Sequence, residues 1–160
     1  MLHVQSYLRN GGTLDGLATE LGIKAKRHQT HSNLVLLKYN QIESPMSSPI
    51  VQECRGIILD EADDWNVVAR AFDKFFNYGE GHAAEINWQT ARVQEKVDGS
   101  LCLVFFYKRE WHVATTGTPD ASGDVNASGK SFADYFWDTL NECGGFKTSM
   151  TTERKLALWW

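Results

Sequence analysis

Short β-rich runs in the middle of the chain constrain its fold more than any other feature. They span residues 34–39, 55–59, 65–71, 101–107 and 111–115, and residues 93–95 are expected to add a further strand. Turn-forming or polar stretches separate the runs, which predicts strands joined by loops and hairpins. The stretch with Pro45 and Pro49 is expected to be a loop, the acidic run 60–64 a solvated hairpin turn, and residues 108–110 the turn of a second hairpin.

Helical patterns flank these strands. Thr13 is a suitable N-cap for a helix with Leu14, Leu17, Ala18 and Leu21 on one face, and Gly22 is a suitable end. Ser131 and Asp134 predict a second capped helix, whose Phe132, Tyr135, Phe136 and Leu140 are expected to enter the core. Strands flanked by helices predict an α+β fold with a mostly antiparallel sheet.

Composition limits the functions that the chain can have. Its 160 residues suffice for one domain, and a hydrophobic content of 42% favours a folded globule. A net charge of −4 provides no global basic field, so any RNA contact needs a local patch. The densest basic cluster is Lys24, Lys26, Arg27 and His28, interpreted as a solvated helix exit with RNA contact as the alternative.

The cysteines and the hydropathy pattern suggest where the protein resides. Cys54, Cys102 and Cys143 stand far apart, which favours free thiols over a disulfide framework or a zinc site. His28 and His31 lack the companions of a metal site, and no metal ligands are predicted. No leader and no apolar run of about 20 residues is present, so a soluble, cytoplasmic protein with no membrane partner is expected.

The sequence Lys-Val-Asp-Gly-Ser at residues 96–100 is the strongest candidate for chemistry. A lysine attacks phosphorus only as the neutral amine, which burial or a neighbouring positive charge favours. A strand before Lys96 would supply that burial. Gly99 lets the backbone turn sharply beside an anion, and Asp98 can orient the lysine or accept a hydrogen bond from ribose. The alternative is an Asp-Gly hairpin turn beside a solvated lysine.

Two segments lie upstream of this motif, at residues 53–59 and 71–80, and the order and spacing of the three segments are informative. With Lys96, Asp98, Gly99 and Ser100 they resemble the start of the ATP-dependent RNA ligases of the bacteriophage tRNA-repair type. The run Lys-Phe-Phe-Asn-Tyr-Gly-Glu at residues 74–80 separates this family from its relatives, and the resemblance covers residues 33–137. It implies a nucleotidyltransferase (ATP-grasp-like) adenylation domain.

The resemblance also implies a reaction. Lys96 would attack ATP to form a covalent lysyl-AMP, with Mg²⁺ on the phosphates. The AMP would pass to an RNA 5′-phosphate, and a 3′-hydroxyl would seal the strand, with nicked tRNA as the expected partner. Tyr39 matches a tyrosine that contacts the nucleotide, Arg55 an arginine that grips ATP, and Lys74 a lysine that binds phosphate. Tyr39 is equally well explained as a core aromatic, and Glu95 is a weaker candidate.

Two departures from the family pattern stand out. Thr116 lies where the family has a basic residue, which removes a contact or moves it to Lys108, Arg109 or Lys130. The later ribose-binding glutamate, metal-binding glutamate and Lys-x-Lys strand are not recognisable. The expectation is therefore that residues 1–160 form the N-terminal portion of an adenylation domain, with burial needed for Trp159 and Trp160.

Three functions are compatible with these features. The first is an RNA ligase represented by its N-terminal part. The second is a noncatalytic nucleotide- or RNA-binding remnant, or one half of a split enzyme that needs a C-terminal fragment or partner chain. The third is a ligase for DNA ends or a capping enzyme, against which the run at residues 74–77 argues.

Overall fold

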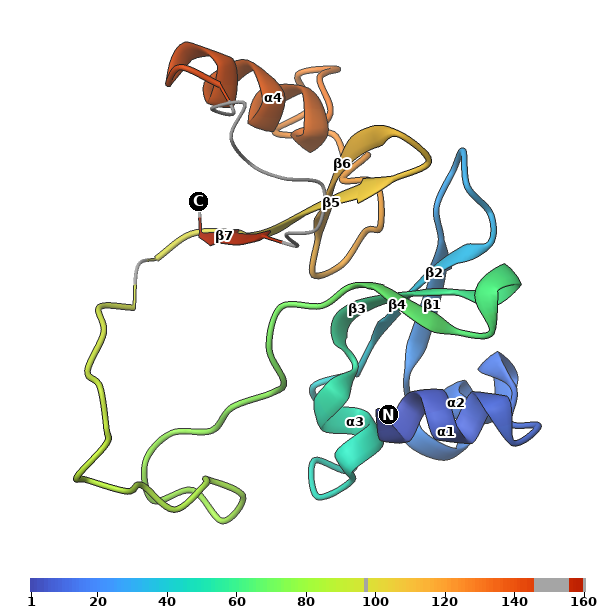
Figure 1. Ribbon diagram of the computed structural model, residues 1–160, viewed down its shortest axis with the longest axis vertical. Helices are drawn as coiled ribbons and strands as arrows, with labels where there is room; N and C mark the ends of the chain where they lie inside the picture. Colours follow the sequence, from blue (N-terminus) through green and yellow to red (C-terminus); the bar gives the residue numbers. More distant parts are fainter. Residues whose placement is uncertain (97, 146–155, 160) are drawn as a thin grey trace.

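Two antiparallel sheets stacked on each other form the centre of the fold (Figure 1). The computed structural model describes residues 1–96, 98–145 and 156–159. The first sheet has the order β1-β2-β3-β4 and the second the order β6-β5-β7. In chain order the elements are α1 (His3–Arg9), α2 (Leu14–Leu21), β1 (Lys24–Arg27), β2 (Leu34–Lys38), α3 (Pro49–Glu53), β3 (Arg55–Asp60), η1 (Glu61–Asp63), β4 (Asn66–Ala69), β5 (Leu101–Tyr107), β6 (Glu110–Thr115), α4 (Phe132–Glu142) and β7 (Leu156–Trp159).

The central strands are apolar on both faces because both faces are covered. In β2, Val35 and Leu37 pack against the N-terminal helices, whereas Leu34 and Leu36 face the second sheet. In β5 the same alternation sends Phe105 toward the first sheet and Val104 toward α4. Successive strand residues point to opposite faces, so each run feeds two cores. The molecule is therefore layered as helices, sheet, sheet and helix (Figure 1). The expected α+β class and antiparallel pairing are confirmed, with two sheets in place of one.

Both helices that the sequence predicts from their caps are present. In α2 the Thr13 hydroxyl accepts a hydrogen bond from the Gly16 N–H, and Gly22 ends the helix at a φ of 64°. In α4 Ser131 and Asp134 form a reciprocal capping box. Phe136 is buried there, but Tyr135 is 40% exposed. The expectation that Tyr135 enters the core is wrong, because the buried stripe of α4 runs through Phe132, Phe136 and Leu140.

The predicted hairpin between β3 and β4 forms, but its acidic run is not wholly solvated. Asp60 is buried and accepts hydrogen bonds from the Asn33 amide and the Tyr107 hydroxyl. Burial alone would raise the pKa of Asp60, but these hydrogen bonds outweigh it and lower the pKa. The rest of the run, residues 61–64, is exposed as expected.

Three expectations about secondary structure are wrong. Residues 93–95 form no strand, and Val93 is 98% exposed, because β6 and β7 occupy both edges of β5. The basic cluster forms the exposed edge strand β1 rather than a helix exit, because residues 24–27 pair with β2. The predicted loop contains α3, which begins at Pro49, a residue suited to a first helical turn.

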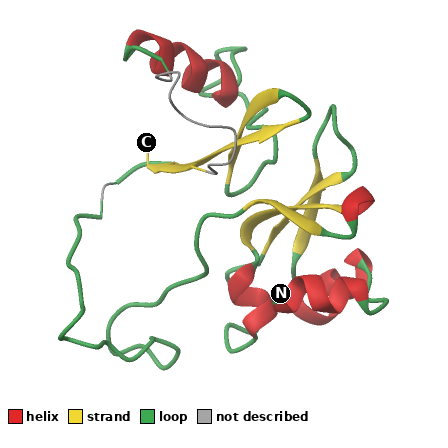
Figure 2. Ribbon diagram, viewed as in Figure 1, coloured by secondary structure: helices red, strands yellow, loops and turns green. Residues whose placement is uncertain are grey.

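The segment between β4 and β5 is a long irregular loop that swings away from both sheets (Figure 2). It carries several exposed large apolar side chains, among them Tyr78, Trp88 and Val93. Strand β7 confirms the strand-like run near the end of the sequence. The expected burial of Trp159 and Trp160 concerns side chains outside the described residues.

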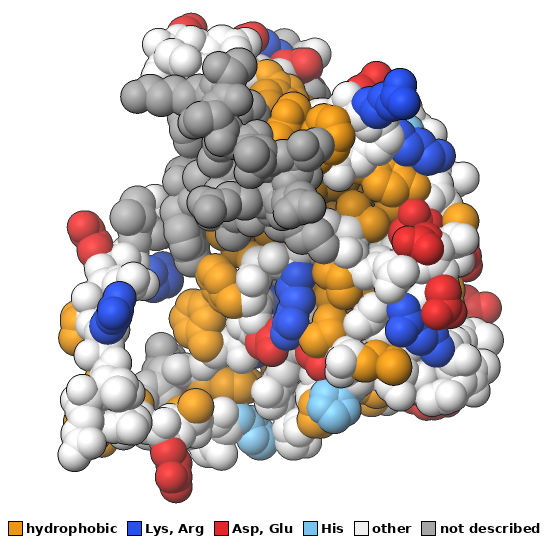
Figure 3. Space-filling view, viewed as in Figure 1, with side chains coloured by type: hydrophobic (Ala, Val, Ile, Leu, Met, Phe, Trp, Pro, Cys, Tyr) orange, Lys and Arg blue, Asp and Glu red, His pale blue; other side chains and the backbone are white. Residues whose placement is uncertain are grey.

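Charged side chains do not gather into one patch on the face drawn in Figure 3, where Lys and Arg alternate with Asp and Glu. None of the described helices combines the length and the apolar character that a membrane crossing requires.

Candidate functional site

A cavity of about 520 Å³ lies where the end of β2 and the start of β3 meet the start of β5 and the loop after β6. Its lining brings together residues that are far apart in the sequence: Lys38, Arg55, Lys96, Gly99, Ser100, Leu101, Thr115, Thr116, Gly117 and Phe132. Three of these side chains are cations, and the described lining residues include no Asp or Glu. A cavity whose described lining carries only positive charge, in a protein of net charge −4, is suited to an anion.

Gly56 allows the two sheets to approach each other beside this cavity. Its φ is 85°, and a Cβ atom added there would lie 2.8 Å from the Cα of Thr116. Thr116 itself sits in a tight turn, in which the Thr115 hydroxyl accepts hydrogen bonds from the N–H groups of Gly117 and Thr118. The glycine and the turn together hold the loop after β6 against the start of β3.

Arg55 is the most constrained cation of the cavity. As the first residue of β3, it places its guanidinium 4.6 Å from the Phe72 ring centroid and 4.9 Å from that of Phe75. Stacking against aromatic faces fixes the plane of a guanidinium. Its Nη1 is buried and has no hydrogen-bond partner in the described structure. A buried donor without a partner is costly, so this nitrogen is available to an anionic ligand.

Lys96 reaches the cavity from the irregular segment before β5. Its side chain lines the cavity together with Gly99, whose φ is 151°. Lys96 is exposed, so the expectation that a preceding strand buries it is wrong: the residues between β4 and Lys96 form no strand. Asp98 is exposed and is not among the lining residues.

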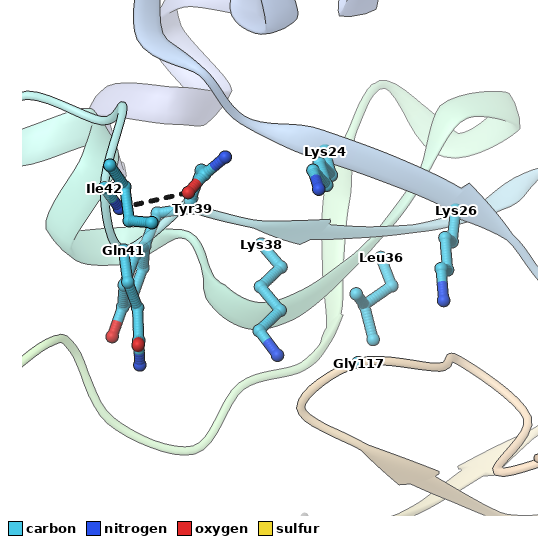
Figure 4. Close-up of a pocket in the computed structure, with 9 residues that line it drawn as sticks. Lys24, Lys26, Leu36, Lys38, Tyr39, Gln41, Ile42 and Gly117 are labelled. Carbon is cyan, nitrogen blue, oxygen red and sulfur yellow. Dashed lines mark hydrogen bonds between the residues drawn. The ribbon is translucent and has the colours of Figure 1, made fainter.

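Lys74 and Tyr39 lie outside this cavity. The Lys74 ammonium donates to the Phe75 carbonyl at 2.7 Å and lies 4.6 Å from the Phe76 ring centroid, at a separate pocket. Phe75, next to Lys74, is 49% exposed and does not belong to the core. Tyr39 belongs to the core beneath β2 and also lines a neighbouring cavity of about 500 Å³ (Figure 4).

Lys38 is the lining cation that the sequence did not single out. It ends β2, directly before Tyr39, and pairs with Arg55 across a bulge between β2 and β3. Figure 4 shows its side chain extending from β2 toward the loop that carries Gly117. The available sequence signal was a lysine ending an otherwise apolar strand. Lys108, Arg109 and Lys130, which the sequence offered as substitutes for a basic residue at position 116, do not line the cavity.

The thiols are placed for packing rather than for chemistry at this cavity. Cys54 and Cys102 are buried and unpaired, and Cys143 is exposed. Burial raises the pKa of the Cys102 thiol to about 11 and raises that of Cys54 further, which keeps both protonated.

Known proteins are similar to this chain over the region that contains the sequence motifs. The profile of a family described as RNA ligase matches residues 53–160, which is more than half of the chain. A protein of Autographa californica nuclear polyhedrosis virus, named as a bifunctional polynucleotide kinase/RNA ligase, is 36% identical over 128 residues, covering 74% of this chain and 18% of the relative. An RNA ligase of Rhodothermus phage RM378 is 33% identical over 119 residues, covering 56% of this chain and 27% of the relative.

The chain thus spans between about a fifth and a quarter of the length of these two relatives. The matched region contains Arg55, Lys74 and Lys96, the residues on which the sequence motifs depend. This chain belongs to the RNA ligase family.

Proposed function

We propose that this chain carries the nucleotide-charging part of an ATP-dependent RNA ligase with a nucleotidyltransferase fold, and that Lys96 is its nucleophile. The observation that carries the proposal is that Lys96 and Arg55, far apart in the sequence, line one cavity whose described residues include no acidic side chain. Arg55 contributes a buried donor without a partner, which a phosphate oxygen would satisfy.

The first step forms a bond between the Lys96 Nζ and the α-phosphorus of ATP. The bond from that phosphorus to the oxygen bridging to the β-phosphate breaks, pyrophosphate leaves, and the amine gives up a proton. Arg55 would hold the phosphates, and the N–H groups around Gly99 would face them at the cavity wall.

Two transfers complete the ligation. A 5′-phosphate oxygen of the RNA attacks the lysyl-AMP, so that the nitrogen–phosphorus bond breaks and AMP caps the RNA end through a pyrophosphate link. The 3′-hydroxyl of the other end then attacks the 5′-phosphate and expels AMP. The proposed partners are therefore RNA ends, of the kind found in a nicked tRNA.

Magnesium would enter this site together with the phosphates of ATP. Among the described residues no group of three or more His, Cys, Asp or Glu side chains is arranged to hold a metal ion. Mg²⁺ is commonly bound through substrate phosphates with few protein ligands, and its charge would there screen the phosphates. The roles of Lys96 and Arg55 do not depend on a metal held by the protein.

Transfer of label from ATP to the protein tests the proposal. Incubation with α-labelled ATP and Mg²⁺ is expected to label the wild-type chain through an acid-labile bond, and Lys96→Ala is expected to abolish the label. γ-Labelled ATP is expected to leave the protein unlabelled, because that phosphate departs with pyrophosphate. Lys108→Ala is the matched control, since Lys108 is exposed on a turn and does not line the cavity. An unchanged label in Lys96→Ala would refute the assignment.

A second function is favoured by one observation, the exposure of Lys96 in an irregular segment. A chain that binds ATP through Arg55 without burying its lysine would be a noncatalytic nucleotide-binding module or half of a split ligase. It would bind ATP by calorimetry yet take up no label. A label that appears only after a C-terminal ligase fragment is added would identify the split enzyme.

A further inference from the structure

Lys38 occupies the boundary between two adjoining cavities. Among the residues that the structure describes, Lys38 and Gly117 alone line both the cavity of Lys96 and the neighbouring cavity shown in Figure 4. The Lys38 ammonium lies 3.6 Å from the point that a Cβ atom on Gly117 would occupy. The side chain therefore crosses from the first sheet to the loop after β6.

The position of this charge is unfavourable unless an anion binds there. Lys38 pairs with Arg55 on the neighbouring strand, so two cations stand side by side at the cavity wall. Like charges on neighbouring strands destabilise a sheet. In the described part of the chain the Lys38 ammonium has no hydrogen bond or ion pair, although its side chain is half-buried.

The opposite wall of the cavity supplies hydroxyls rather than charge. Thr115 and Thr116 line the cavity from the end of β6 and the loop after it, and the Lys38 ammonium reaches the same loop beside Gly117. The loop after β6 carries Thr116 in place of a basic residue, and Lys38 on β2 supplies a positive charge beside that loop. The resulting pair, Lys38 and Arg55, presents donors from adjacent strands to one ligand.

We propose that Lys38 binds the oligophosphate chain of the nucleotide in the Lys96 cavity and takes the place of a basic residue at position 116. This role rests on the proposed function, since it assumes that the cavity accepts ATP. Lys38 would act as a point charge, whereas Arg55 would act through its planar fork. The pair would hold the phosphates that leave as pyrophosphate.

Equilibrium binding separates this role from catalysis. Calorimetry with ATP and with inorganic pyrophosphate is expected to show about tenfold weaker binding for Lys38→Met, with AMP affected less. Lys24→Met is the matched control, because Lys24 pairs with Lys38 across β1 and β2 yet does not line the Lys96 cavity. Denaturation in urea verifies that each variant folds.

Restoring the charge tests the mechanism. Lys38→Arg is expected to recover most of the pyrophosphate affinity, and the double variant Lys38→Met/Thr116→Lys is expected to recover part of it. Unchanged binding in Lys38→Met, an equal loss in Lys24→Met, or no recovery in either charge-restoring variant would overturn the proposal, as would a wild-type chain that binds neither ATP nor pyrophosphate. ATP binding without label transfer would instead indicate the noncatalytic module or the split ligase, and it would leave the role of Lys38 to be decided by the binding of its variants.

Discussion

Single residues decide how closely the two sheets meet at the cavity. Gly56 is buried, has a φ of 85°, and leaves no space for a side chain against the backbone of Thr116. Arg55, one position earlier, depends on the same approach, because the loop that contacts Gly56 forms the far wall of its cavity. The glycine thus serves both the packing and the site.

Gly56→Ala is expected to destabilise the protein by roughly 1–3 kcal/mol, because alanine is strained at this φ and its methyl group would displace a backbone atom. Urea denaturation measures the change as a lower midpoint. Gly123→Ala is the control, since a Cβ atom there has open space and no positive φ to adopt. Equal stability of the two variants would contradict this account.

Individual helices and hairpins form as the sequence predicts where their capping or turn residues are all present. Thr13 and Gly22 bound α2, and the capping box of Ser131 and Asp134 starts α4. The turn between β5 and β6 places Lys108 at a φ of 46° and Arg109 at 71°, which suits a tight hairpin. Residues 93–95 had a β-like pattern, but both edges of β5, the next strand in the chain, are already paired with β6 and β7.

Ser131→Ala is expected to cost about 1 kcal/mol, because the Asp134 N–H loses its acceptor at the start of α4. The loss is measured by thermal or urea denaturation, and helical circular dichroism should decrease with it. Ser131→Thr keeps the hydroxyl and is expected to retain most of the stability. A full loss in the threonine variant would show that the cap is not the cause.

At the scale of the whole molecule, polar contacts tie the two sheets together at the end remote from the cavity. The Tyr107 hydroxyl on β5 donates to the Asp60 carboxylate at the end of β3. Nearby, His28, His31 and His112 bring their ring centroids within 5.1–5.4 Å of one another. His28 follows β1 and His112 lies in β6, so the cluster joins both sheets.

Stability is expected to fall as the pH drops below about 6.5, the ordinary histidine pKa. Burial lowers the pKa of His28, and the neighbouring imidazoles lower it further, against the opposing charge of Asp120. Burial also lowers the pKa of His112, with His31 adding to the effect and the Tyr107 carbonyl and Glu110 opposing it. The unfolded chain then binds protons that the folded protein excludes, so acidification favours unfolding.

Urea midpoints at about pH 7.5 and about pH 5.5 measure this effect. His28→Gln is expected to reduce the difference between the two midpoints, whereas His3→Gln, at an exposed residue outside the cluster, should leave it unchanged. A pH dependence that persists in full in His28→Gln would exclude this cluster as its source.

The sequence by itself determined the local elements, because caps, strand periodicity and turn residues act within a few positions of one another. It also determined the family, through the motif at Lys96 and the segment around Lys74. Only the tertiary structure decided which side chains meet. It placed Arg55, Lys96 and Lys38 around one cavity, Lys74 at another, and residues 93–95 in no sheet. These outcomes depend on strand edges and on the stacking of two sheets, which are contacts between distant segments that no local pattern encodes.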